Sequence, residues 1–192
     1  MLLAQIRPAI VSLIFFTVLT GVLYPLLVTG IAQTVFHKQA EGSLITSSDG
    51  KILGSSLIGQ NFDDPKYFWS RISATSPVYN ASSSSGSNLG PTNPALLDEV
   101  KGRITALKAA DPNNTDPIPV DLVTSSGSGL DPHISLAAAH YQLARVARMR
   151  GLSTDAVQHI IDQNTQGRFL GLLGEPVVNV LELNLALDQY KK

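Results

Sequence analysis

Histidines and one Ser/Gly-rich loop are the residues whose types could carry chemistry in this chain of 192 residues. Two of the four histidines, His133 and His140, could lie near one helix face if that helix begins early enough. The metal-ligand pattern HExxH is absent, and neither a cysteine nor a close carboxylate completes a metal site. We therefore interpret the histidines as solvated side chains, and we predict no catalytic residue and no metal site.

The Ser/Gly-rich loop covers residues 125–131 and precedes a predicted helix. Backbone N–H groups in such a loop, followed by a helix N-terminus, can hold a phosphate. The signal is weak, because Ser/Gly loops are common and the P-loop pattern G-x-x-x-x-G-K-[ST] is absent. The pattern G-x-S-x-G is absent too, so no serine is marked as a nucleophile. The residues alone favour a structural loop.

Charged residues are few and unevenly placed. They make up 15% of the chain, against about 25% in an average soluble domain. Lys and Arg number 14 and Asp and Glu 15, a net charge of −1 without a basic stripe, which argues against a nucleic-acid partner. The chain has no cysteine, which excludes disulfides and thiolate metal sites. Arg7 is the only charged residue among the first 37.

The uncharged stretch predicts one membrane-spanning helix over about residues 8–32. A bilayer core of about 30 Å needs about 20 apolar residues, so this stretch can span it. Two alternatives stay open: a cleavable signal peptide, with a weak cleavage pattern at residues 30–32, and a buried core helix. Pro25 removes one backbone hydrogen bond and predicts a kink.

Small residues near Pro25 would let a second membrane helix approach closely. We take four residues as candidates for helix packing: Gly21, Tyr24, Pro25 and Gly30. A lone anchor with an incidental proline is the alternative. Arg7 and the α-amino group lie before the helix, whereas Lys38 behind it is offset by Glu41. Positive charge prefers the cytoplasmic side, so we expect a cytoplasmic N-terminus and an external C-terminal part.

We divide the chain into an N-terminal segment, residues 1–36, and a soluble domain, residues 37–192. The domain is long enough for one compact core. A turn at Asp49-Gly50 predicts a hairpin, and an aromatic run over residues 67–69 is predicted to pack in the core. The polar stretch 70–94 is longer than an ordinary loop, so it is either functional or disordered.

Apolar spacing and capping residues predict the remaining elements. They are helices over about 94–110, 135–150, 153–164 and 181–189, and one strand over 119–124. The fold class we expect is therefore a single N-terminal transmembrane helix followed by an α+β domain with three to four helices and few short strands.

Several stretches, in order along nearly the whole chain, resemble the C subunit of the Kdp potassium-transporting P-type ATPase. The N-terminal part of the likeness is Arg7-Pro-Ala9, the Tyr-Pro-containing span over residues 21–27, and the segments 42–45 and 54–62. The middle part is the aromatic segment 67–71 with Ser73-Ala74, and the loop Tyr79-Asn80 with residues 85–94. The most specific stretch is VDLVTSSGSGLDPHIS, residues 120–135, and the tail matches over 174–180 and 183–188. The Ser-rich residues 82–85 depart slightly from the family loop.

The resemblance implies a non-catalytic accessory subunit of an ATP-driven complex in the bacterial inner membrane that imports K⁺. Its implied partners are a channel-like K⁺-translocating subunit, a P-type ATPase subunit, a small membrane peptide and the lipid bilayer. It implies a role in assembly and no tightly bound cofactor. An alternative role for the family is a catalytic chaperone that raises the affinity of the pump subunit for ATP.

The two roles point to different residues. The chaperone role would use the Ser/Gly loop and a glutamine, so its candidate residues are Ser125, Gly127, Ser128, Gly129, Asp131 and Gln142. For partner contact in the long polar loop, the candidates are Asn80, Gly86, Asn88 and Asn93. With a cytoplasmic N-terminus the domain would be periplasmic, with about 30 Å of hydrocarbon between it and ATP. We therefore expect a cap beside the K⁺ entrance.

Overall fold

The structure is a computed structural model that describes residues 2–190 and the side chains of residues 4–190. It forms two compact units, an N-terminal unit that ends at Leu53 and a C-terminal unit that begins at Gly54. The division that the sequence suggests, between residues 36 and 37, lies at the end of the long apolar helix, which ends at Val35. The two compact units divide further along the chain, after Leu53.

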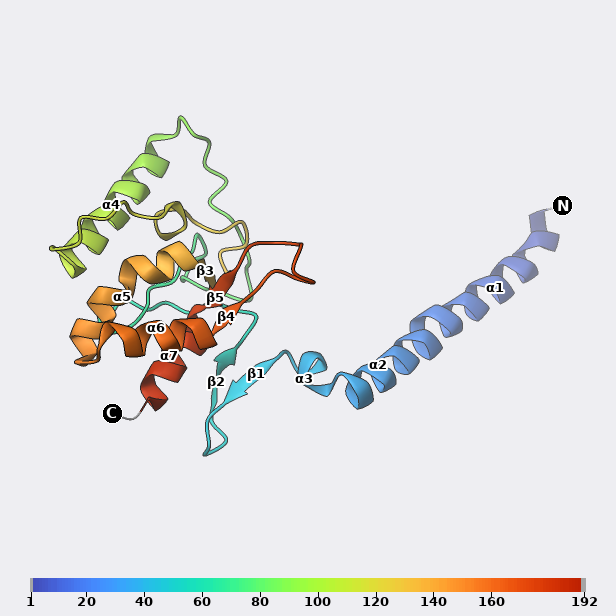
Figure 1. The fold of residues 1–192 in the computed structure, drawn as a ribbon. Coiled ribbons are helices and arrows are strands. Elements are labelled where there is room, and N and C mark those ends of the chain that lie inside the picture. The colour runs from blue at the N-terminus through green and yellow to red at the C-terminus, as the bar shows by residue number, and fades with distance from the viewer. Residues whose placement is uncertain (1, 191–192) are drawn as a thin grey trace. The chain divides into compact units, whose positions relative to one another are not determined.

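The N-terminal unit begins with a long apolar helix (Figure 1). It consists of α1 (Leu2–Val18), a π-helical segment (Leu19–Leu23) and α2 (Tyr24–Val35), and the one-turn helix α3 (His37–Ala40) follows. The stretch Ala4–Val35 is long and apolar enough to cross a membrane, and its most apolar part is not buried by any other part of the structure. The predicted apolar helix is confirmed, with ends beyond residues 8 and 32.

The disruption expected at Pro25 takes the form of one wide helical turn. Pro25 follows the π-helical segment directly, and the Tyr24 N–H donates to the Leu19 carbonyl, five residues back. A π turn of this kind adjusts the hydrogen-bond ladder around a residue that lacks an N–H. The Thr20 hydroxyl donates to the Phe16 carbonyl at 2.7 Å, so this polar side chain is hydrogen-bonded to the backbone of its own helix.

A β-hairpin follows α3, as the Asp-Gly signal predicts, and its second strand contains the boundary between the two units. It pairs β1 (Leu44–Thr46) with β2 (Ile52–Ser55). The Gly50 N–H donates to the Ser47 carbonyl at 2.9 Å. Gly50 has φ +81°, which glycine adopts without steric cost.

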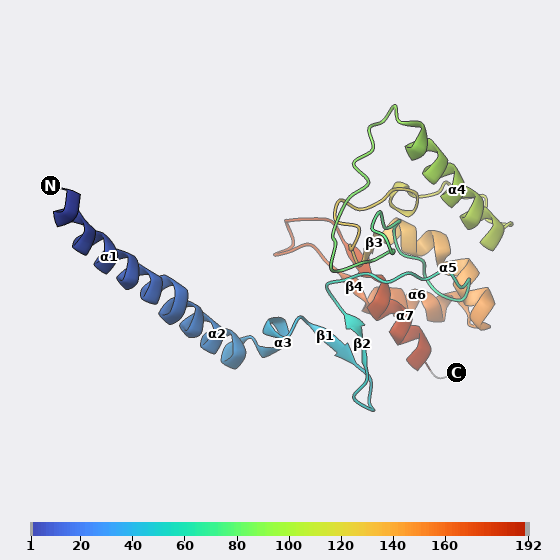
Figure 2. The ribbon, with the colours of Figure 1, turned by 180° about the vertical axis from the view of Figure 1, so that it is seen from behind.

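Over residues 54–190, the C-terminal unit combines four α-helices with a small antiparallel sheet, arranged as Figure 1 shows. The helices are α4 (Pro94–Ala110), α5 (Leu136–Arg150), α6 (Thr154–Gln163) and α7 (Val180–Gln189). The sheet has the order β3-β5-β4, with strands His133–Ser135, Val177–Asn179 and Thr165–Gln166. Ile134 and Thr165 both lie opposite Val178, one in each neighbouring strand. Seen from behind, α5, α6 and α7 lie together and α4 lies along one side (Figure 2).

Short polar side chains cap the N-termini of three of these helices, close to the starts that the sequence predicts. The Asn93 carboxamide accepts from the Ala95 N–H at 3.0 Å, and Ser135 and Ser153 accept from N–H groups three residues on. Gly151 ends α5 in the left-handed conformation, with φ +61°. The predicted helices are thus confirmed to within a residue or two.

The core lies between the helices and the sheet. Its fully or almost fully buried apolar side chains include Phe68, Trp69, Leu107, Leu122, Ile134, Val146, Val157, Ile161, Val178 and Leu183. Phe68 is inaccessible to solvent and Trp69 is 6% exposed, which confirms the predicted core role of the aromatic run. Burial of such aromatic side chains is a large stabilising contribution in a domain of this size.

Two local predictions are wrong. Residues 119–124 do not form a strand, because a 3-10 turn (Val120–Leu122) follows Pro119, and the Leu122 N–H donates to the Pro119 carbonyl. The Asp121 carboxylate accepts from the Ser135 N–H at 2.8 Å, which ties this turn to the start of α5. His133 does not share a helix face with His140 either, because it lies in β3 and α5 begins at Leu136.

Candidate functional site

The two polar loops that the sequence singles out lie against each other in the C-terminal unit. We call residues 71–86 and 125–131 the paired loops. Ile72 and Ser125 form a parallel β-bridge, and the Ser85 N–H donates to the Ser128 carbonyl at 2.9 Å. The Ser73 hydroxyl donates to the Gly129 carbonyl at 2.7 Å. These hydrogen bonds hold residues 71–86 of the long polar stretch against the second loop.

Glycine is required where the paired loops meet. A Cβ on Gly129 would lie 2.6 Å from the Ser85 carbonyl oxygen, and the residue has φ +69°. A Cβ on Gly86 would lie 2.9 Å from the Gly127 carbonyl oxygen. No real Cβ approaches backbone oxygen so closely, so the Gly/Ser composition of these loops serves close backbone contact.

An ion pair joins the two loops at their inner end. The Arg71 guanidinium donates to the Asp131 carboxylate at 3.0 Å and to the Ser125 carbonyl at 3.1 Å. The other Asp131 oxygen accepts from the His133 N–H at 3.0 Å. Burial raises the pKa of Asp131, but the hydrogen bonds from His133 and the Arg71 charge outweigh it and leave the pKa below its ordinary value.

Buried amide side chains hold the aromatic run from the other side. Asn184 of α7 accepts from the Phe68 N–H at 2.9 Å and donates to the Phe68 carbonyl at 3.0 Å. Gln142 of α5 accepts from the Trp69 N–H at 2.8 Å and donates to the Trp69 carbonyl at 3.2 Å. Each amide therefore pairs both backbone groups of one residue, as a neighbouring strand would.

Two guanidinium groups contact the Trp69 ring. Arg103 and Arg145 lie 5.0 and 4.8 Å from the ring centroid. The Arg145 guanidinium also donates to the Pro65 and Tyr67 carbonyls and to the Gln142 side-chain oxygen. Arg145 is 2% exposed, and burial lowers its pKa to about 10. Backbone carbonyls and an aromatic face thus solvate a buried cation.

The structure does not bring the predicted residues of the nucleotide role together at one surface. The loop residues 125–131 lie in the paired loops, whereas Gln142 is 1% exposed and its polar atoms are bound to Trp69, Ala138 and Arg145. Gly127 and Ser128 are the exposed part of the loop. The carbonyls of residues 125, 128 and 129 accept hydrogen bonds from residues 71–85.

The predicted partner-contact residues lie along the long polar loop. The Asn80 N–H donates to the Thr75 hydroxyl at 2.9 Å, and its carboxamide accepts from the Ser82 N–H at 3.1 Å. Asn88 is exposed and has φ +52°, a conformation that asparagine tolerates. Asn93 serves as the cap of α4.

The predicted packing face of the apolar helix is open. A Cβ on Gly30 would meet nothing within 4 Å, and one on Gly21 would touch only a Thr17 methyl group at 4.0 Å. Tyr24, in the same wide turn, is 63% exposed. Among the residues that the structure describes, nothing therefore requires glycine at these two positions.

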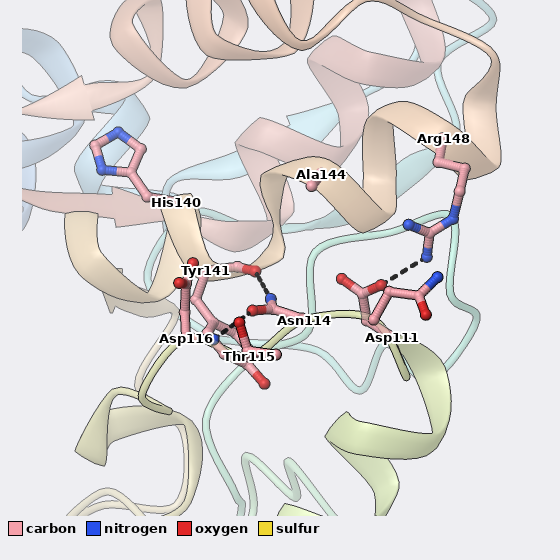
Figure 3. A pocket seen from close by; sticks show the side chains of 9 residues that line it. Asp111, Asn114, Thr115, Asp116, His140, Tyr141, Ala144 and Arg148 are labelled. Carbon is pink, nitrogen blue, oxygen red and sulfur yellow. Dashed lines mark hydrogen bonds and ion pairs between the residues drawn. The ribbon is translucent and has the colours of Figure 1, made fainter.

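A polar pocket of about 310 Å³ lies between the end of α4 and α5 (Figure 3). Arg148 donates to Asp111 at 2.7 Å on one side of it, and the Asn114 side chain donates to the Tyr141 carbonyl at 2.9 Å on the other. His140 lies at its edge. Across residues 2–190, no three His, Cys, Asp or Glu side chains gather closely enough to hold a metal ion.

A second hollow, of about 350 Å³, adjoins the paired loops. Its walls include Arg71, Ser73 and Arg103 together with Asp98 and Glu99 of α4. Opposite charges therefore line it side by side. Such a surface suits polar contact with a partner better than selective binding of one small ion.

Comparison with known protein families gives a match that covers nearly the whole chain. Residues 6–189 match the family described as "KdpC: K+-transporting ATPase, c chain". The chain belongs to the KdpC family. The match covers both the apolar helix and the C-terminal unit, and it confirms the likeness read from the sequence.

Individual KdpC relatives are similar over their full length. The "Potassium-transporting ATPase KdpC subunit" of Herpetosiphon aurantiacus is 64% identical over 186 residues, 96% of each chain. Those of Methylococcus capsulatus and Polaromonas naphthalenivorans are 63% and 65% identical, and the alignments cover 95% and 97% of this chain and 96% and 95% of theirs.

Sequence reasoning missed Asn184 and Arg145, which complete the buried polar network around the aromatic run. A signal was present in α5, where Gln142 and Arg145 share the helix face of Ala138 and Val146. Two polar residues on an otherwise apolar, buried face require partners elsewhere in the fold.

Proposed function

We propose that the chain is a non-catalytic accessory subunit of an ATP-driven K⁺-import complex in the bacterial inner membrane. Membership in the KdpC family over residues 6–189 is the observation that carries this proposal. The apolar helix would anchor the chain in the bilayer and pack against membrane helices of the complex. The C-terminal unit would stabilise the assembly and cap the K⁺ entrance.

The surface chemistry of the paired loops supports the role of a cap. Their exposed residues are uncharged, and many of them, such as Ser82, Ser83 and Ser128, carry hydroxyl groups. Arg71 and Asp131 neutralise each other at 3.0 Å. A surface of this kind can hydrogen-bond to a partner without repelling K⁺ or holding it tightly. The partners in this proposal are a channel-like subunit, a P-type ATPase subunit and a small membrane peptide.

The proposed sidedness follows from charge. Arg7 lies near the N-terminal end of the apolar helix, within α1, and the positive-inside preference favours a cytoplasmic N-terminus and a periplasmic C-terminal unit. ATP would then be about 30 Å of hydrocarbon away. The burial of Gln142 argues in the same direction, because a nucleotide could reach it only if the core opened. We therefore favour the cap over a role in raising the ATP affinity of the pump subunit.

Substitution of the open glycine tests the proposed packing of the helix. Gly21→Leu adds a large side chain where the chain itself has room. We expect the variant to reach the membrane in normal amounts, while at least several-fold less of the other subunits copurifies with it, because a partner helix can no longer approach closely.

Val22→Leu is the matched control, since Val22 is an exposed neighbour on the same turn. It should copurify like the unsubstituted chain. Full copurification with Gly21→Leu would show that the helix is a simple anchor at this position.

A further inference from the structure

The loop between β4 and β5 carries four large apolar side chains that the described part of the chain leaves mostly exposed. Phe169, Leu170, Leu172 and Leu173 are 69%, 79%, 80% and 63% exposed. The loop extends away from the helices of the C-terminal unit (Figure 1). Such a cluster on a protruding tip costs free energy in water and marks a surface that is covered in the functional state. We call residues 168–175 the apolar tip.

Four backbone hydrogen bonds form within the apolar tip. Phe169 and Leu173 exchange N–H and carbonyl bonds at 2.8 and 3.0 Å. The Gly171 N–H donates to the Arg168 carbonyl, and the Leu172 N–H donates to the Phe169 carbonyl. Hydrocarbon admits a loop only when its backbone polar groups are paired within the protein. The apolar tip pairs part of its backbone in this way, which fits a shallow position at the headgroup boundary, where water still reaches the other polar groups.

The base of the apolar tip is neutral. The Arg168 guanidinium binds both Glu175 oxygens, at 3.0 and 2.8 Å. This ion pair closes the loop where the apolar side chains begin, and it leaves the loop without net charge. The attraction that such a loop offers is therefore apolar, and a surface rich in anionic lipid is not needed.

A membrane is always within reach of the C-terminal unit if the apolar helix is inserted. Only residues 36–53 separate the end of α2 from Gly54. Even fully extended, this connection spans no more than about 60 Å, and the hairpin β1–β2 shortens it. The tether converts a weak apolar attraction into a frequent contact, because the local concentration of lipid is high.

We propose that the apolar tip inserts shallowly into the headgroup–hydrocarbon boundary of the bilayer that holds the chain. It would form a second membrane contact beside the apolar helix and restrict the orientation of the C-terminal unit. The inference rests on the membrane anchoring proposed above, and no lipid headgroup is recognised specifically. The competing possibility is that a pocket of another protein covers the apolar tip, and the experiment must distinguish this from insertion into lipid.

The test places a fluorescent side chain on the apolar tip. The full chain carrying Leu172→Trp is reconstituted in phosphatidylcholine vesicles, with or without bromine atoms on the acyl chains. Trp69 is the one tryptophan of the unsubstituted chain, so the fluorescence of that chain gives the constant background to subtract. Val120→Trp is the matched control, since Val120 is 71% exposed in the same unit and lies outside the apolar tip.

We expect the indole introduced at position 172 to emit at shorter wavelength than the one at position 120. Brominated lipid should quench it at least twofold more, equally at low and high salt. Equal quenching at the two positions would overturn the proposal. So would protection of position 172 that develops only when the other subunits are present, since it assigns the apolar tip to a protein. A chain that does not float with vesicles after an alkaline wash would overturn the anchoring as well.

Discussion

At the scale of single residues, two buried carboxamides explain how an extended aromatic segment is held without a neighbouring strand. Asn184 pairs both backbone groups of Phe68, and Gln142 pairs both backbone groups of Trp69. A buried backbone group without a partner costs about 1–3 kcal/mol. The two side chains therefore contribute strongly to stability, although neither contacts the surface.

Gln142→Leu should lower the free energy of unfolding by about 2–4 kcal/mol, because the Trp69 N–H and carbonyl lose their partners. Denaturant titration of the full chain in detergent micelles, followed by the fluorescence of buried Trp69, measures it. Gln163→Leu, the same change at an exposed position of α6, should shift stability by no more than about 0.5 kcal/mol. An unchanged stability of Gln142→Leu, together with loss of saturable labelling by a photoactivatable ATP analogue, would favour the nucleotide role instead.

At the scale of elements, the paired loops behave as one structural element built from two distant stretches. Their conformations depend on each other, since Ser73, Ser84 and Ser85 donate to carbonyls of the other loop. The sequence reveals the composition of both loops but not their contact, because no local rule connects residues so far apart in the chain. For the same reason β3 and β5 were not predicted, whereas the locally determined caps of the helices were.

Gly129→Ala should destabilise the C-terminal unit by about 2 kcal/mol or more. The added Cβ meets the Ser85 carbonyl oxygen, and φ +69° is unfavourable for alanine. Gly127→Ala, at a position with open space, should change stability by at most about 0.5 kcal/mol. Thermal unfolding of the two variants compares them directly, and equal melting temperatures would mean that the loops do not depend on this contact.

The Asp131 carboxylate should make the stability of the paired loops depend on acid pH. Its pKa is depressed in the folded chain, so its contribution is present above the unfolded pKa of about 3.9 and is lost as pH falls through the lower folded value. The stability difference between the unsubstituted chain and Asp131→Asn should therefore be largest near neutral pH and shrink below about pH 4. Asp63→Asn, at an exposed position, should give a small difference. A constant difference for Asp131→Asn down to pH 3 would contradict this account.

At the scale of the whole molecule, an apolar helix with one charged residue, Arg7, and a sparsely charged C-terminal unit belong to one chain of the KdpC family. Composition alone predicted the helix, because so long an apolar run without charge is typical of a membrane span. The α+β class followed from capping residues and apolar spacing. The partners of Gln142, Arg145 and Asn184 could not be predicted, because each side chain finds them only in the folded core.

The side of the membrane on which the C-terminal unit lies is the most direct test of the proposed cap. The chain has no cysteine, so a single Met149→Cys or Gln5→Cys substitution marks one side cleanly, and both positions are exposed. A membrane-impermeant maleimide is added to intact spheroplasts that produce the complete complex. We predict that the thiol at position 149 reacts at once, whereas the thiol at position 5 reacts only after the membrane is permeabilised. Reaction at position 5 with protection of position 149 would contradict the periplasmic cap.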